Sequence, residues 1–211
     1  MSATEALQES TSLAETAPGA GLPPATAYSN PALLGLLGFI LATFMANFGA
    51  VKWISTDVAL WVGVVIGGLG QIIAGLLHFR LRDNFAFLVF LAFGFFWVTT
   101  PLFRIADQTH FFQVATSSVA AWLFLWAGIS TLFLVGSLYV NRTFPIVFAF
   151  LIPGLILQGF GTLSSSSGLN QSGGYLLIAC TVPACYALVV VFLNGVTGHE
   201  RLTLGPPVLA P

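Results

Sequence analysis

The sequence predicts an all-α integral membrane protein with six transmembrane helices. Two observations carry this prediction. Hydrophobic residues make up 57% of the chain and charged residues only 6%, whereas a water-soluble domain carries about 25% charged residues. The apolar residues also fall into six long stretches separated by short polar segments. A spanning helix needs about 20 mostly apolar residues, and its backbone must satisfy its own hydrogen bonds in lipid. The composition therefore excludes a water-soluble domain.

Residues 1–29 differ from the rest of the chain. They are rich in Ala, Ser, Thr, Pro and Gly, and they contain Glu5, Glu9 and Glu15 but no Lys or Arg. This composition predicts a disordered tail. A secretory signal would begin with basic residues, and a transit peptide would contain Arg. We therefore expect the first membrane helix to act as the insertion signal, as in a prokaryotic inner-membrane protein.

The transmembrane domain is predicted over residues 30–198, followed by a short tail of residues 199–211. Its apolar stretches predict helices at residues 33–51, 58–79, 85–103, 116–140, 144–163 and 174–194. An even number of spans places both termini on one side of the membrane. That side would hold four basic residues and the other side two, Lys52 and Arg104. Because basic residues favour the cytoplasmic side, both termini are predicted to be cytoplasmic.

The second span contains a ribbon of small residues. Gly63, Gly67, Gly70 and Ala74 follow one another at steps of four, three and four, which places them on one helix face where another backbone can approach. Gln71 and the following His78 lie seven residues apart, beside that ribbon. Two readings stay open for this pair. Gln71 joins two helices and His78 caps the cytoplasmic helix end, or both side chains line a path for a solute.

The buried polar residues are neutral. No Asp, Glu, Lys or Arg lies in the middle of a predicted span, where each would cost about 2.5 to 3.5 kcal/mol. Proton pumps with buried carboxylates and voltage sensors are therefore disfavoured. A neutral lining suits a small solute that is neutral or weakly acidic. The candidate polar residues are Asn47, Gln71, Thr99, Thr100, Gln158, Tyr186 and Asn194.

The sequence offers no pattern typical of an enzyme. Its three histidines are far apart, and none pairs with an acidic residue at the spacing of metal ligands. We therefore expect no catalytic residues, no metal site and no cofactor. The net charge of −1 and the lack of a basic run give no support for a nucleic-acid partner.

Several motifs resemble those of the acetate uptake transporter family, the bacterial succinate-acetate permeases and their yeast relatives. Residues 30–36 read Asn-Pro-Ala-Leu-Leu-Gly-Leu, similar to the family's Asn-Pro-Ala-Pro-Leu-Gly-Leu, with Leu33 in place of the second proline. Residues 67–77 are similar to the family's second span. The resemblance continues through Asn84-Phe85, Gly94, Phe96-Trp97 and Leu193-Asn194. It covers the whole membrane part, about residues 30 to 200.

This resemblance implies a homo-hexameric ring in the lipid bilayer, with a path through each protomer. The implied substrates are acetate and related small carboxylates such as succinate, commonly moved with protons. The family's constriction corresponds to Phe39, Phe93 and Leu151 here, and Phe93 lacks the hydroxyl of the usual Tyr. The expected polar stations are Asn30, Gln71, Asn47, Thr99 and Asn194.

The sequence departs from the family at a position of chemical interest. Where the family often has a glutamate after Ala-Gly-Leu-Leu, this chain has His78. Imidazole changes its charge within the physiological pH range, so His78 is a candidate for proton coupling. Two alternatives stay open, namely acetic acid transport without a protein proton carrier and a passive channel.

Two other classes of function compete with carboxylate transport. A urea or small-amide channel would share the six-span hexameric design and the neutral lining. A non-transporting membrane scaffold would use the aromatic residues and the small-residue ribbon for packing alone. The Asn-Pro-Ala motif and the motif of the second span favour the carboxylate family over the amide channel.

Overall fold

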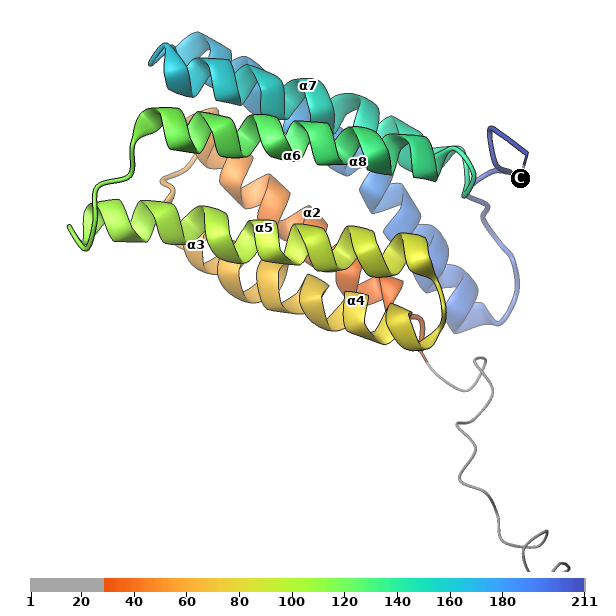
Figure 1. Ribbon diagram of the computed structural model, residues 1–211. Coiled ribbons are helices and arrows are strands. Elements are labelled where there is room, and N and C mark those ends of the chain that lie inside the picture. Colours follow the sequence, from red (N-terminus) through yellow and green to blue (C-terminus); the bar gives the residue numbers. More distant parts are fainter. Residues whose placement is uncertain (1–28, 211) are drawn as a thin grey trace, which may run out of the picture.

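The computed structural model describes residues 29–210 and is all-helical within them. Six helices in this part of the chain are long and apolar enough to cross a membrane, which confirms the predicted fold class. The predicted N-terminal tail, residues 1–29, lies outside the described residues except for Ser29. The helices of Figure 1 are α2 (Ala32–Ala50), a second span built from α3 (Asp57–Trp61), η2 (Val62–Leu69) and α4 (Gly70–Arg80), then α5 (Asn84–Gln108), α6 (Thr116–Ser137), α7 (Thr143–Leu163) and α8 (Ser167–Thr197).

The observed bounds differ from the predicted spans by more than three residues at two places. Helix α5 continues to Gln108, so Arg104 lies on a helix and not in a loop. Helix α8 begins at Ser167 and includes residues predicted as a loop, since Ser166 caps it by accepting a hydrogen bond from Leu169 N. The glycines there allow close packing. A methyl group at Gly173 would lie 2.7 Å from the carbonyl oxygen of Gly154.

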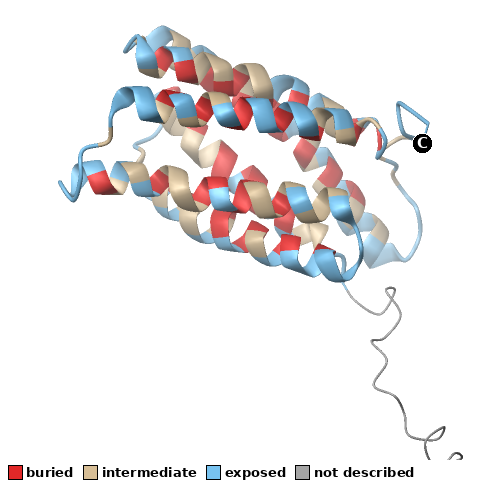
Figure 2. Cartoon of the chain, viewed as in Figure 1, coloured by how far each residue is buried: buried red, intermediate tan, exposed pale blue. Residues whose placement is uncertain are grey.

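The helices form two groups of three spans (Figure 1). Helix α2, the second span and α5 pack together, and so do α6, α7 and α8. Helix α2 also packs against α8 and so joins the two groups. Helices α5 and α6 approach each other less closely than neighbours within a group. The space between them is filled by side chains, and the buried residues gather on the inward faces of the helices (Figure 2).

The two ends of the bundle carry different parts of the chain (Figure 1). The start of α2, the α4–α5 turn, the α6–α7 turn and the C-terminal tail lie at one end, here called the termini end. The α2–α3, α5–α6 and α7–α8 connections lie at the opposite end, here called the far end. This arrangement is what an even number of spans requires.

The small residues of the second span bring three helices close together. A methyl group at Gly67 would lie 2.5 Å from Ala42 Cβ of α2, and one at Gly63 would lie 3.0 Å from Pro101 Cγ of α5. Further along the same interface, a methyl at Gly75 would lie 2.8 Å from Leu91 N. The predicted close approach is therefore confirmed at Gly63 and Gly67. At Gly70 the nearest side chain, Leu34, is 3.6 Å away.

The close approach at Gly75 gives a test of the packing. We expect Gly75→Ala to destabilise the protein by about 1 to 3 kcal/mol, because the added methyl forces α4 and α5 apart. Thermal unfolding of the purified protein in detergent measures this loss. Gly128→Ala in α6 is the matched control, since nothing lies within 4 Å of a methyl group there. Equal melting temperatures for the two variants would contradict the packing described here.

Candidate functional site

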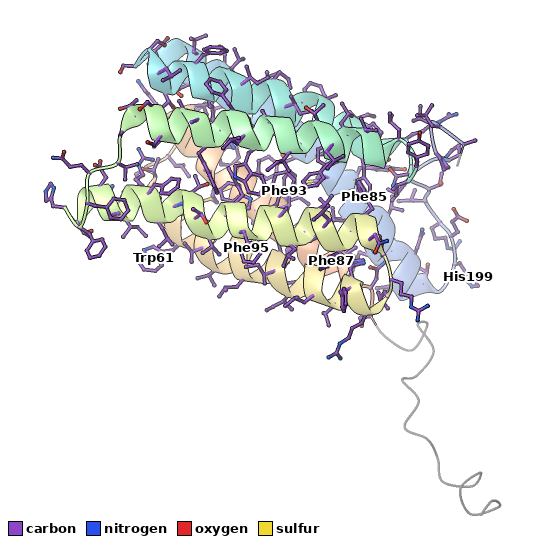
Figure 3. The ribbon with its side chains drawn as sticks, viewed as in Figure 1. Trp61, Phe85, Phe87, Phe93, Phe95 and His199 are labelled. Carbon is purple, nitrogen blue, oxygen red and sulfur yellow. The ribbon has the colours of Figure 1, made fainter. Side chains whose placement is uncertain are left out.

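An aromatic barrier lies between the two helix groups, formed by Phe39, Phe93, Trp126 and Phe133. Phe93 of α5 is only 3% exposed, and Figure 3 shows it pointing into the space between α5 and α6. Its ring centroid lies 5.9 Å from that of Phe39 of α2, 5.7 Å from Trp126 and 5.8 Å from Phe133. The edge-to-face contacts favour this arrangement. The barrier thus joins helices that otherwise approach each other little.

Two cavities meet at this barrier, and Phe39 and Phe93 line both. The larger one, about 700 Å³, is here called the Arg104 cavity and reaches the far end at Lys52, Arg104 and Asp107. The smaller one, about 230 Å³, is here called the His78 cavity and lies at the termini end. The two phenylalanine side chains therefore separate a cavity at the far end of the bundle from a cavity at the termini end.

The Arg104 cavity carries more positive than negative charge at its open end. Lys52, Arg104 and Asp107 are exposed there, and none of them makes an ion pair with another described residue. Two cations against one carboxylate attract anions to this mouth. Deeper in the cavity the polar side chains are neutral and include Asn47, Thr100 and Gln158.

Hydrogen bonds between helices hold all three of these neutral side chains. Gln158 Nε2 of α7 donates to Asn47 Oδ1 of α2 over 2.9 Å, and Asn47 Nδ2 donates to the carbonyl oxygen of Thr43 over 2.8 Å. Thr100 Oγ1 of α5 accepts a hydrogen bond of 3.0 Å from Trp122 Nε1 of α6. The polar wall of the Arg104 cavity is thus fixed by residues from four helices.

In the His78 cavity, Gln71 is the most deeply buried polar side chain. It is 1% exposed, and neither its amide nitrogen nor its amide oxygen has a hydrogen-bond partner among the described residues. It is the second residue of α4, which continues directly from the π-helix η2, a wider helical turn that is often found at functional sites. Its Cγ lies close to Gly38, next to Phe39 of the barrier. A buried amide without partners costs about 1 to 3 kcal/mol, so an occupant that bonds to it is favoured.

His78 and Asp83 form an acid–base pair in the same cavity. His78 is 4% exposed, and its Nδ1 lies 3.4 Å from Asp83 Oδ2, a long contact with poor hydrogen-bond alignment. Asp83 also caps α5, because its Oδ1 accepts from Ala86 N over 3.0 Å. The contact with His78, followed by the Ala86 N–H, lowers the pKa of the Asp83 carboxyl below its usual value. Asp83 therefore stays charged at neutral pH.

The structure brings most of the predicted site residues together around the barrier. Phe39 and Phe93 are in contact, and Leu151 lines the Arg104 cavity beside them together with Asn47. Asn30, Gln71 and His78 line the His78 cavity. Asn30 also caps α2, since its Oδ1 accepts a hydrogen bond of 2.9 Å from Ala32 N. Thr99 and Asn194 line neither cavity.

Two residues of the site, Thr100 and Asp83, were not among the expected polar stations or proton-coupling residues, for identifiable reasons. One face of α5 lines the Arg104 cavity with Phe93, Trp97, Thr100 and Arg104, which are spaced at the helical period. Thr100 lies on this face with Phe93, whereas Thr99 does not. Asp83 was not selected because it lies in a polar turn. Its position directly before the start of a span is, however, a typical helix-capping signal.

Asn194 has a different role, which is to hold the C-terminal tail. Its Oδ1 accepts hydrogen bonds from Arg201 N and Leu202 N over 2.7 and 3.2 Å, and its Nδ2 donates to Leu202 O over 2.8 Å. Tyr186 Oη donates to Thr203 O over 2.8 Å. These bonds bring Leu204 into the lining of the His78 cavity. The tail therefore helps to enclose that cavity at the termini end.

Comparison with known proteins identifies the family. The model of the GPR1/FUN34/yaaH family matches residues 13–204, nearly the whole chain. This protein belongs to the GPR1/FUN34/yaaH family. Within the family, the chain is 29% identical over 183 residues to the succinate-acetate/proton symporter SatP of Escherichia coli, covering 85% of this chain and 97% of that protein. It is 24% identical to acetate permease A of Emericella nidulans, covering 75% of this chain and 60% of that one.

A solved structure in the family has the same fold. The structure described as the bacterial acetate channel SatP superposes with a TM-score of 0.79 at 27% identity, covering 84% of this chain and 99% of that chain. The family also includes a yeast protein named ammonia transport outward protein 2, which is 28% identical over 178 residues and matches 80% of this chain and 63% of the yeast protein. The GPR1/FUN34/yaaH fold is thus a multi-pass membrane bundle.

The tail contacts predict a local effect of changing Asn194. We expect Asn194→Ala to release the tail, because three hydrogen bonds to its backbone are lost. Hydrogen exchange at the amides of Arg201, Leu202, Val208 and Leu209 should become faster by at least about tenfold, the equivalent of one net hydrogen bond. Tyr186→Phe removes a single bond and should have a smaller effect. Unchanged exchange in Asn194→Ala would contradict the anchoring role.

Proposed function

We propose that this protein moves acetate and related small carboxylates across a membrane, through a path in each protomer that crosses the aromatic barrier. The observation that carries the proposal is the pair of cavities at opposite ends of a six-span bundle, separated by Phe39 and Phe93. The names of the relatives, which mention acetate and succinate, support it. The cations at the mouth of the Arg104 cavity suit an anionic substrate.

In this proposal the barrier residues form the constriction and the polar residues form stations on either side. Phe39, Phe93 and Leu151 narrow the path and exclude water, which favours a small and poorly hydrated solute. Asn47 in the Arg104 cavity and Gln71 in the His78 cavity offer amide N–H groups to a carboxylate. Asn30 lies at the open end of the His78 cavity, where it also caps α2.

The proposal includes an assembly and an orientation. The protein forms a homo-hexameric ring in a prokaryotic inner membrane, with both termini in the cytoplasm. The distribution of basic residues supports this orientation. The Arg104 cavity then opens to the outside, where Lys52 and Arg104 collect anions, and the His78 cavity opens to the cytoplasm.

A urea or small-amide channel is the alternative function. Such a channel would use the same six-span design and a similar aromatic constriction. The charged mouth of the Arg104 cavity favours the carboxylate, because a neutral amide gains nothing from the excess of positive charge there.

Uptake of labelled acetate into proteoliposomes tests the pathway. We expect saturable uptake that Phe39→Trp reduces strongly, because a larger ring at the constriction blocks the path. Gln71→Ala should raise the half-saturation concentration about tenfold, which corresponds to one hydrogen bond to a charged group. Phe95→Trp is the matched control, since Phe95 is 53% exposed on the outer face of α5 and should leave uptake unchanged.

The control for assembly decides what a negative result means. Native mass spectrometry of the purified protein should show six chains. No uptake above empty vesicles, from protein that is folded and hexameric, would contradict acetate transport and make urea and small amides the next substrates to test.

Proton coupling is assigned to His78 in this proposal. His78 and Asp83 are the only titratable side chains among the residues that line the His78 cavity, so a proton taken up there has two possible sites. Asp83 has a lowered pKa and stays charged near neutral pH, so we assign the coupling to the other residue of the pair, His78.

A proton gradient should therefore stimulate acetate uptake in the native protein. His78→Gln should abolish this stimulation while retaining uptake without a gradient, because the neutral amide cannot take up a proton. Asp83→Asn keeps a capping side chain and should weaken the stimulation. Full stimulation in His78→Gln would show that protons move with acetic acid and not through this side chain.

A further inference from the structure

The polar wall of the Arg104 cavity has an excess of hydrogen-bond donors. The first is the hydroxyl of Thr100, whose oxygen accepts the N–H of Trp122 over 3.0 Å. Many helical threonines donate to the carbonyl one turn back, as Thr109 and Thr131 do here. Within residues 29–210, no such bond is found for Thr100. Its proton is therefore free for an occupant of the cavity.

The second donor is the amide of Gln158. One N–H of Gln158 Nε2 is bonded to Asn47 Oδ1, and this bond uses the amide oxygen of Asn47. The amide nitrogen of Asn47 is bonded in turn to Thr43 O. The other N–H of Gln158 has no partner among the described residues, and the Gln158 side chain is half-buried at the cavity wall. The pair therefore uses the amide oxygen of Asn47 internally and leaves an N–H donor of Gln158, next to the Gln158 amide oxygen, which also has no described partner.

Two further donors lie in the same wall without any partner. The Thr43 hydroxyl and the Trp97 indole N–H make no hydrogen bond with described residues, although the two side chains are only 3% and 6% exposed. An indole N–H can only donate. Buried donors without acceptors cost about 1 to 3 kcal/mol each, so they favour a ligand rich in acceptor atoms.

From this donor excess we infer that the Arg104 cavity contains a carboxylate-binding subsite formed by Thr100 and Gln158, with Thr43 and Trp97 as supporting donors. The inference rests on the proposed carboxylate transport and specifies one of its binding sites. An ionised carboxylate carries only acceptors, which matches the free donors. Acetamide has nearly the same shape as acetate, but its NH₂ group cannot accept hydrogen bonds, so acetamide would leave some of these donors unpaired.

Trp122 is a positioning residue in this subsite. It lies on α6, packs parallel to Phe96 at a centroid distance of 6.3 Å, and acts on the substrate only through the Thr100 oxygen. Without the Trp122 N–H, the Thr100 hydroxyl is expected to rotate and donate to the carbonyl one turn back, as the hydroxyls of Thr109 and Thr131 do. The donor would then be lost although Thr100 itself is present.

Acetate uptake kinetics in proteoliposomes test the subsite. Thr100→Val should raise the half-saturation concentration about tenfold, and Thr100→Ser should restore the native value because the hydroxyl returns. Thr99→Val is the matched control, since Thr99 lies next along the chain but lines neither cavity. Gln158→Leu should have an effect similar to that of Thr100→Val, and it serves if the Thr100 variant does not fold.

A double-mutant cycle tests the role of Trp122. Trp122→Phe keeps the aromatic packing and should raise the half-saturation concentration several-fold with an unchanged maximal rate. Trp122→Phe combined with Thr100→Val should be no worse than Thr100→Val alone, because both changes remove the same donor. A purely structural role of Trp122 would instead lower the maximal rate at a constant half-saturation concentration.

The outcomes separate this inference from the proposed function. Unlabelled acetate should compete with labelled acetate at least about tenfold better than acetamide does. If the native protein takes up acetate but both Thr100→Val and Gln158→Leu keep its half-saturation concentration, the subsite is wrong and acetate transport stands. Equal competition by acetamide would also overturn the subsite. No uptake by the native protein would overturn the proposed function itself.

Discussion

The contact between Phe39 and Phe93 is the interaction around which this protein is organised. It joins α2 to α5 inside the aromatic barrier, and Phe93 extends the contact to Trp126 and Phe133 of α6. These rings bridge α5 and α6, which approach each other little, whereas α2 and α8 make the main helix contact between the two groups. The same two phenylalanines separate the two cavities. The contact between these helices and the separation of the two cavities thus depend on the same side chains.

The chemistry around the barrier is asymmetric. The Arg104 cavity combines a charged mouth with neutral donors that bonds between helices hold in place. The His78 cavity is smaller and contains a buried amide without partners and an acid–base pair. A weakly acidic solute would therefore meet fixed donors on one side and a titratable group on the other. Neutral donors have a further advantage, because a buried cation would bind an anion too tightly for rapid release.

Several features were predictable because they follow from local rules. Six apolar stretches predict six spans, since backbone in lipid must be helical. The small residues at helical spacing predict the close approach of the second span, which the short contacts at Gly63 and Gly67 confirm. The long apolar segments set the helix bounds to within a few residues at most ends. The predicted start of α8 was wrong. The Ser- and Gly-rich residues before residue 174 were taken as a loop, although tight packing supports a helix there.

By itself the sequence determined the membrane location, the number of spans and the lack of charged residues in the middle of the spans. These features depend on composition and on the length and spacing of the apolar stretches. Only the tertiary structure decided which polar residue acts where. Thr99 and Thr100 are neighbours with the same side chain, yet only the phase of α5 against α6 gives Thr100 its bond to Trp122. Asn194 is as polar as Asn47, but it holds the tail while Asn47 lies in a cavity. The partner of a buried polar group comes from another helix, and packing between helices fixes that choice.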